Sequence, residues 1–287
     1  MAFESLQDII TICNEKKKEF WEVVLEDDCQ ERKVSREDSM KQMRDTWDAI
    51  LLAASTYEKN LTSSSGLVGK DGYKMEVFAN NKSSLCGNYM NRVMAGALQM
   101  GESNACMKRI VAAPTAGSCG VLPAVLVPYF MDKRADTNAI IKAMYVGAGI
   151  GQVIAFRASI SGAAGGCQAE IGSASAMAAG CMTYLQGGNS KQIIHACAMA
   201  LKNLLGLVCD PVAGLVEVPC VKRNVIGAVN AMSATDMAMA GIESRIPPDQ
   251  VIDAMKEIGD KMDVSLRETG KGGLAATPAA IALGLTK

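Results

Sequence analysis

The chain has 287 residues, 49% of them hydrophobic, which is enough to enclose the core of one large domain or two modest ones. Its 29 lysines and arginines are balanced by 30 aspartates and glutamates, and the formal net charge is −1. The sequence has no basic stripe, so it gives no support for binding nucleic acid or an anionic membrane, and we expect a small-molecule ligand.

The N-terminal residues lack the basic segment and following apolar run of a secretory signal, so we expect a cytoplasmic protein. Two uncharged stretches, residues 110–131 and 171–190, are about as long as a membrane span. Glycines or prolines are spread along both, which favours buried irregular backbone, and we expect no membrane association.

The first clear element is an amphipathic helix beginning near Ser35, where the sequence Ser-Arg-Glu-Asp is suited to capping a helix. Apolar residues then recur at steps of three and four: Met40, Met43, Trp47, Ile50, Leu51 and Ala54. Residues 62–73, TSSSGLVGKDGY, predict a polar glycine-rich loop, and helical patterning resumes near Tyr89.

Alanine, glycine, serine and methionine dominate residues 91–241, and few runs alternate in the manner of β-strands. Small side chains allow helices to approach closely, so this region predicts tightly packed, largely buried helices. A further helix is predicted from Pro248, with an apolar face formed by Val251, Ile252, Met255, Ile258 and Met262. The tail, residues 269–287, is predicted to be loop-like.

These patterns predict a mainly α fold, a compact bundle of small-residue-rich helices whose glycine-rich loops form a ligand site. No fixed-period repeat and no dividing linker is evident. We therefore expect residues 1–287 to form one domain, with residues 1–60 as an N-terminal helical extension.

Ten cysteines in a chain expected to be cytoplasmic indicate metal binding, catalysis or simple burial rather than disulfides. Cys167 follows two glycines, Cys209 precedes Asp-Pro and Cys220 follows a proline, so each lies at a break in the backbone. The spacings of 42 and 11 residues match neither short ferredoxin nor zinc-finger patterns, and both a shared metal site and burial remain open. Cys119, in a glycine-rich turn, is undecided, and the others lie in helical or polar patterns.

Four segments together resemble the alpha subunit of iron-sulfur-dependent L-serine dehydratases. They are SGAAGGCQAEIGSASAMAAG (161–180), CDPVAGLVEVPCVKRN (209–224), APTAGSCG (113–120) and RETGKGGLAATP (267–278). The likeness extends over most of the chain from about Ser65. One departure is Lys70, at a position where the resemblance leads us to expect a glycine.

The resemblance implies that Cys167, Cys209 and Cys220 bind a [4Fe-4S] cluster, which leaves one iron without a protein thiolate. It implies that this iron is the Lewis acid for loss of the serine hydroxyl, and that the products are pyruvate and ammonia. In this family a beta subunit, or a fused beta part, carries a Ser-Ser-His-Thr motif thought to supply the base. No such motif occurs here, so we expect a beta subunit to complete the active site.

Substrate contacts are assigned from polarity in the glycine-rich segments. Thr115, Ser118 and Ser161 are candidates for binding the substrate carboxylate, and Asn224 or Gln168 for orienting the amine. Each has a structural alternative, since such residues also cap helices and form turns. Further polar residues expected to contact substrate, support the cluster loops or close the pocket are Glu170, Asp210, Arg223, Arg267 and Glu268.

Competing hypotheses remain at this point. A related helical lyase could act on cysteine or threonine, and a non-catalytic subunit could hold structural zinc through the same thiols. No lysine lies in a recognisable pyridoxal-phosphate pattern. The single histidine, His195, lies in a predicted helix and is expected to be structural or solvent-facing rather than the base.

Overall fold

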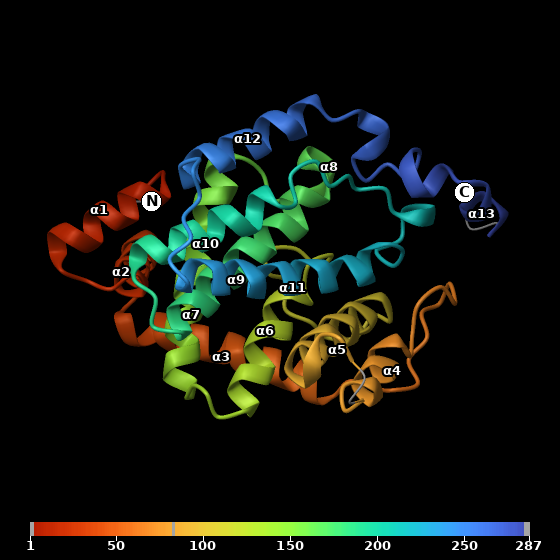
Figure 1. Ribbon diagram of the computed structural model, residues 1–287, viewed down its shortest axis with the longest axis horizontal. Coiled ribbons are helices and arrows are strands. Elements are labelled where there is room, and N and C mark those ends of the chain that lie inside the picture. Colours follow the sequence, from red (N-terminus) through yellow and green to blue (C-terminus); the bar gives the residue numbers. More distant parts are fainter. Residues whose placement is uncertain (1–2, 82–83, 284–287) are drawn as a thin grey trace.

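The computed structural model describes residues 3–81 and 84–283, and all regular structure in those ranges is helical (Figure 1). This confirms the predicted mainly α fold. The α-helices are α1 (Leu6–Lys16), α2 (Phe20–Arg32), α3 (Arg36–Ser55), α4 (Asp71–Phe78), α5 (Gly87–Ala105), α6 (Val121–Met131), α7 (Thr137–Arg157), α8 (Gly162–Gly165), α9 (Ser173–Leu185), α10 (Ser190–Lys202), α11 (Cys220–Met239), α12 (Pro248–Lys261) and α13 (Pro278–Ala282). Short irregular helices are η1 (Gln168–Gly172), η2 (Val212–Gly214), η3 (Val264–Leu266) and η4 (Gly273–Ala276).

Helix α9 is the centre of the bundle, and α7, α10 and α11 pack around it (Figure 1). Every residue from Ser173 to Thr183 is buried, as expected of a helix that is apolar on all sides. The neighbouring helices approach so closely that a Cβ added at Gly180 would lie 2.1 Å from Cδ1 of Ile150. The small residues of this region therefore pack as predicted.

The helices before residue 60 share the same hydrophobic core. Phe3, Leu6 and Ile9 belong to it, and α2 packs against α7. Helix α3 begins where the sequence predicts, because the Ser35 hydroxyl accepts a 3.0 Å hydrogen bond from the amide of Asp38. The ring of Trp47 on α3 is fully buried.

The predicted loop at residues 62–73 is too long, because α4 begins within it at Asp71. The buried carboxylate of Glu102 caps this helix, accepting a 2.7 Å hydrogen bond from the amide of Asp71 and a 2.6 Å bond from the Tyr57 hydroxyl. Lys70, just before the helix, has a φ of 70°. That left-handed conformation suits glycine, the residue that the family resemblance leads us to expect there.

Helix α12 begins with Pro248 in its first turn and buries Val251, Ile252 and Met255, as predicted. The helix ends at Lys261, so Met262 lies beyond the predicted face in extended backbone. The tail is less irregular than predicted. It contains η4 and the short helix α13, which begins after Thr277, whose hydroxyl accepts a hydrogen bond from the amide of Ala280. A five-residue helix leaves too short a periodic pattern to be recognised in a stretch rich in glycine and alanine. Residues 284–287 of the predicted tail lie outside the described residues.

Among the described residues, α7 alone is long and apolar enough to cross a membrane by length and composition, with a mean hydropathy of 1.6 in its most apolar window. However, 61% of that window is buried inside the structure. Helix α7 packs against α2 and α9 and is a core helix of the bundle.

Candidate functional site

Cys167, Cys209 and Cys220 line one small cavity. Cys167 precedes the π-helical turn η1, Cys209 lies in the loop after α10, and Cys220 is the first residue of α11. All three side chains are buried. The breaks in the backbone identified in the sequence therefore bring three distant thiols to one place.

Cys167 is fixed by its immediate neighbours in the chain. Gly166 has a φ of 76°, and a Cβ there would lie 2.7 Å from Met262 and 2.8 Å from the carbonyl oxygen of Leu207. Gln168 is fully buried, its amide donates to the carbonyl of Met255, and its Oε1 accepts from the amide of Gly206. The Gln168 side chain is thus committed to backbone groups rather than open to a ligand.

Cys209 is held by the C-terminal loop through backbone pairing. Its amide donates a 2.8 Å hydrogen bond to the carbonyl of Leu266, and its carbonyl accepts a 2.7 Å bond from the amide of Glu268. Glu268 has a φ of 63°, an uncommon conformation for a residue other than glycine, and it lines the cavity. Of the two residues predicted to close the pocket, Glu268 lines the cavity and Arg267 does not.

The charges around the thiols favour a thiolate at Cys167. A hydrogen bond from the Cys209 thiol and the nearby guanidinium of Arg223 lower the pKa of Cys167. The pKa of Cys209 is correspondingly raised, because its proton is shared with Cys167 and because its side chain is buried. Burial raises the pKa of Cys220 to about 12. Of the three thiols, Cys167 therefore loses its proton most readily.

Arg223, one of the predicted supporting residues, contacts Cys167 and pairs with Asp210, another of them. Its Nη1 lies 3.5 Å from Sγ of Cys167 and donates a 2.8 Å hydrogen bond to the carbonyl of Val208. Its Nη2 forms a 2.8 Å ion pair with Asp210, and both side chains are largely buried. Asp210 also accepts a 2.8 Å hydrogen bond from the amide of Leu274. This ion pair ties α11 to the Cys209 loop and to the C-terminal loop.

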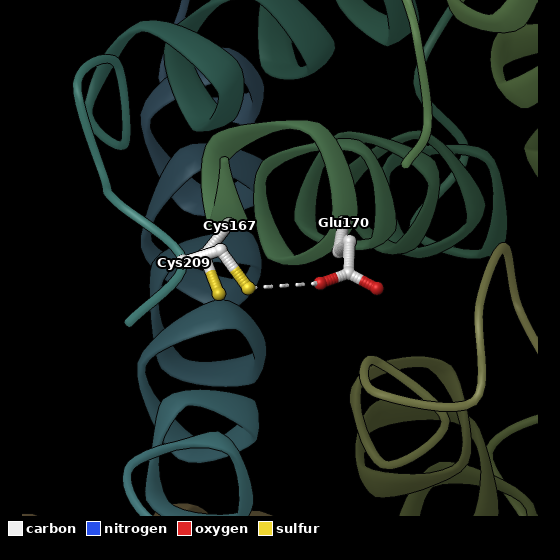
Figure 2. Close-up of side chains that lie close together, drawn as sticks. All are labelled: Cys167, Glu170 and Cys209. Atoms are coloured by element: carbon white, nitrogen blue, oxygen red, sulfur yellow. Dashed lines mark hydrogen bonds between the residues drawn. The ribbon is translucent and has the colours of Figure 1, made fainter. Parts of the chain in front are cut away.

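Glu170 is the acidic residue closest to the thiols (Figure 2). One atom of each of Cys167, Glu170 and Cys209 lies within 4.8 Å of the others, and Sγ of Cys209 is 3.9 Å from Oε2 of Glu170. The Thr115 hydroxyl donates a 2.8 Å hydrogen bond to Oε1. Burial raises the pKa of Glu170, and the negative charge of Glu268 raises it further.

Thr115 and Ser118 lie in the loop that forms another wall of the cavity. Their hydroxyls are 3.1 Å apart, and Ser118 is fully buried. Gly117, between them, lines the cavity itself. The structure therefore brings Thr115 to Glu170, with Ser118 bonded behind it, while neither residue lines the cavity itself.

The other two predicted substrate contacts, Asn224 and Ser161, lie in different parts of the structure. Asn224 is buried on α11 and uses its whole amide on backbone groups, donating to the carbonyls of Gly117 and Cys220 and accepting from the amide of Gly120. Ser161 is exposed at the start of α8 and is not among the residues that line the cavity.

His195 lies apart from this site. It lines a separate surface pocket, and its Nδ1 accepts a 3.1 Å hydrogen bond from the amide of Ser244. Its Nε2 is 3.7 Å from Glu243. The expectation that this histidine is structural agrees with these contacts.

Of the remaining cysteines, none lines the cavity. Cys119 was undecided from sequence; it is fully buried, and its Sγ lies 3.7 Å from the carbonyl oxygen of Met100. Cys181 is also fully buried, and burial raises the pKa of each of these two thiols to about 12. Cys86 is exposed.

Sequence reasoning missed one connection to the site. Glu217, three residues before Cys220, is buried and accepts hydrogen bonds from the hydroxyls of Ser63 and Ser65. No local pattern reveals this contact, because the partners lie more than 150 residues apart in the sequence.

Comparison with known proteins places the chain in a family. The model of the family described as "Serine dehydratase alpha chain" matches residues 15–275. The chain is 46% identical over 276 residues to the probable L-serine dehydratase, alpha chain, of Bacillus subtilis, covering 96% of this chain and 92% of that protein. It is 42% identical over 275 residues to the L-serine dehydratase, alpha chain, of Peptoniphilus asaccharolyticus, covering 94% and 93%.

A longer relative matches over a shorter range. L-serine dehydratase TdcG of Escherichia coli is 45% identical over 190 residues, which are 66% of this chain and 42% of that protein. The extent of the family match and the identity to chains of similar length leave one conclusion. The chain belongs to the serine dehydratase alpha chain family.

Proposed function

We propose that this chain is the alpha subunit of an L-serine dehydratase that converts L-serine to pyruvate and ammonia and binds a [4Fe-4S] cluster through Cys167, Cys209 and Cys220. The observation that carries the proposal is the meeting of three buried thiols on one cavity in a chain of this family. The alpha-chain relatives are named for L-serine, which favours this substrate over cysteine or threonine.

The residues of the cavity fit an iron-sulfur cluster by their donor chemistry. Thiolates are the usual protein ligands of such clusters, and the cavity presents three thiols. With three protein thiolates, a bound four-iron cluster would supply one open iron as a Lewis acid for the substrate hydroxyl. Arg223 offsets the negative charge that gathers when the thiols lose their protons.

The polar residues around the cavity are given two kinds of role. We assign Thr115 and Ser118 to the substrate carboxylate, because their hydroxyls flank cavity-lining Gly117. Asn224 acts indirectly, because it holds Gly117 and Gly120 in place through its amide. Ser161 is assigned to the outer edge of the site, where it precedes Gly162, which contacts Glu170.

The base that removes the α proton is assigned to a beta subunit. The single histidine, His195, lies in a different pocket, and in the described part of the chain no lysine or histidine lines the cavity. Two relatives of similar length are named as alpha chains, and the match to the Escherichia coli protein covers only 42% of its length. Both observations support a second protein part, and we place the complex in the cytoplasm as an enzyme of amino-acid degradation.

The test is anaerobic purification followed by visible absorption and by iron and sulfide analysis. We expect a brown protein with about four irons per chain. Cys167→Ala, Cys209→Ala and Cys220→Ala should each lose the cluster, whereas Cys86→Ala, which changes an exposed cysteine outside the cavity, should retain it. A colourless protein that retains zinc through the three thiols would contradict the proposal.

Activity is then measured after reconstitution with a beta subunit, with L-serine, L-threonine and L-cysteine as alternative substrates. We expect L-serine to have the highest kcat/KM. Full activity of the alpha chain alone would contradict the assignment of the base to the partner.

A further inference from the structure

Among the residues that the structure describes, two carboxylates are the only charged groups that line the thiol cavity. Glu170 lies beside the thiols, and Glu268 is an exposed residue on the C-terminal loop. Among the described residues, no lysine or arginine forms an ion pair with either of them. Arg223, the nearest cation to the thiols, is already paired with Asp210. The cavity is thus lined with negative charge that has no cationic partner.

The position of Glu170 is built by residues on two other segments. A Cβ at Gly162 would lie 2.6 Å from Oε2 of Glu170, and a Cβ at Gly117 would lie 3.3 Å from Oε1. A side chain at either glycine would crowd the Glu170 carboxylate. Thr115 orients this carboxylate by its hydrogen bond. Figure 2 shows this carboxylate directed to the same side as the thiols of Cys167 and Cys209.

The two oxygens of Glu170 differ in what they bind. Oε1 accepts from Thr115, and Oε2 lies near the thiol of Cys209. At 3.9 Å this contact with sulfur is long, and among the described residues Oε2 accepts no shorter hydrogen bond. A half-buried carboxylate oxygen without a close donor is unfavourable. The cavity therefore favours a cationic hydrogen-bond donor beside Oε2.

Resting on the proposed function, we propose that Glu170 binds the α-ammonium group of the amino-acid substrate, with Glu268 contributing from the loop at the cavity. An ammonium group carries three donors and a positive charge, as Lys side chains do. It matches the acceptor left free on Glu170 and the negative charge of the cavity. The substrate carboxylate then lies toward the loop of cavity-lining Gly117, while the Thr115 hydroxyl stays bonded to Glu170.

The test uses the cluster-loaded chain with its beta subunit and two ligands that differ only in the amino group, L-alanine and propanoate. Neither can lose water. Their inhibition constants against L-serine and their dissociation constants by calorimetry are measured for the wild-type protein and for Glu170→Gln. Glutamine keeps the shape and can still accept the hydrogen bond from Thr115. Iron and sulfide are counted in each preparation.

We expect Glu170→Gln to weaken the binding of L-alanine by about 30-fold, because one charge-assisted hydrogen bond is lost. The affinity for propanoate should change by less than about twofold. Glu268→Gln should weaken L-alanine in the same direction by about two- to fivefold, because its side chain is exposed. Glu257→Gln, on the exposed face of α12 and outside the cavity, is the matched control and should change neither ligand.

If Glu170→Gln weakens the binding of L-alanine and of propanoate equally, the inference is overturned and the carboxylate has a structural role. A fall in kcat with an unchanged ratio of the two affinities would also overturn it and would assign the carboxylate to proton transfer. If Glu170→Gln loses iron, Glu268→Gln tests the ratio of the affinities for L-alanine and propanoate without a change beside the thiols. A wild-type complex that binds L-alanine but leaves L-serine intact would refute the proposed function and leave the inference to be decided by calorimetry.

Discussion

The hydroxyl of Ser63 donates a 2.8 Å hydrogen bond to the carboxylate of Glu217, a residue 154 positions later in the chain. Both side chains are buried, and Ser65 donates to the same oxygen. The contact fastens the loop before α4 to the segment that carries Cys220. A loop that appears independent in the sequence is thus tied to the segment that carries one of the thiols.

Glu217→Ala should lower the free energy of unfolding by about 1–3 kcal/mol, because two serine hydroxyls lose their charged acceptor. Urea unfolding of the metal-free chain measures the change. Ser233→Ala removes an exposed hydroxyl that bonds only to the carbonyl of Asn230, and it should change stability by less than about 0.5 kcal/mol. Equal stability of Glu217→Ala and the wild type would show that the contact adds nothing.

Asn224→Ala should destabilise the chain by about 1–3 kcal/mol, since buried backbone groups at Gly117 and Gly120 lose their partners. Because the same bonds position the Thr115 loop, we also expect a higher KM for L-serine in the reconstituted enzyme. Asn203→Ala, which removes an exposed amide paired only with Asn230, is the control. An unchanged KM in Asn224→Ala would remove the positioning role.

Gly180→Ala should cost about 1–3 kcal/mol of stability, because the added methyl meets Ile150 in a packed core. Ile150→Val shortens that side chain and should recover part of the loss when it is combined with Gly180→Ala. The double-mutant cycle by urea unfolding gives the coupling energy. Strictly additive losses would mean that the two residues do not meet.

The stability of the chain should rise between pH 5.5 and pH 7.5 through His195. Burial lowers its pKa, partly opposed by Glu243 and reinforced by Lys191 and Lys202. The unfolded chain therefore binds more protons than the folded chain in this range. The stability contributed by His195 is fully present above the unfolded pKa of about 6.5 and is lost as the pH falls through the lower folded value.

The structural cause is that Nδ1 accepts the amide of Ser244 only when it carries no proton. Urea unfolding at both pH values measures the slope, and His195→Asn, which can still accept the hydrogen bond but does not titrate, should reduce it. A slope that is identical in the variant would assign the pH dependence to other groups.

The fold could be predicted where the sequence repeats a signal over many residues. The spacing of apolar residues from Met40 to Ala54 and the small residues of α9 both extend over several turns. Helices α4 and α13 were missed because eight and five residues offer too little pattern. Helix α4 also depends on Glu102, which caps it from a different helix.

The site shows the same limit. Glycines and prolines beside Cys167, Cys209 and Cys220 indicate breaks in the backbone, and those breaks bring the thiols to one cavity. Asn224 carries no local sign that its amide is occupied by backbone groups from another segment. The role of a side-chain amide depends on its partners. Gly120 and Asn224 are 104 positions apart, and no local sequence pattern reveals that they are paired.

The pairing of Cys209 with residues 266–268 has a consequence for how the protein is made. The loop that carries Cys209 has its backbone partners only after Leu266 and Glu268 have left the ribosome, and Asp210 gains the amide of Leu274 later still. A nascent chain that has already produced all three thiols therefore still lacks the finished site. A chain stalled in α12 would therefore carry every thiol and yet leave Cys209 without its backbone partners.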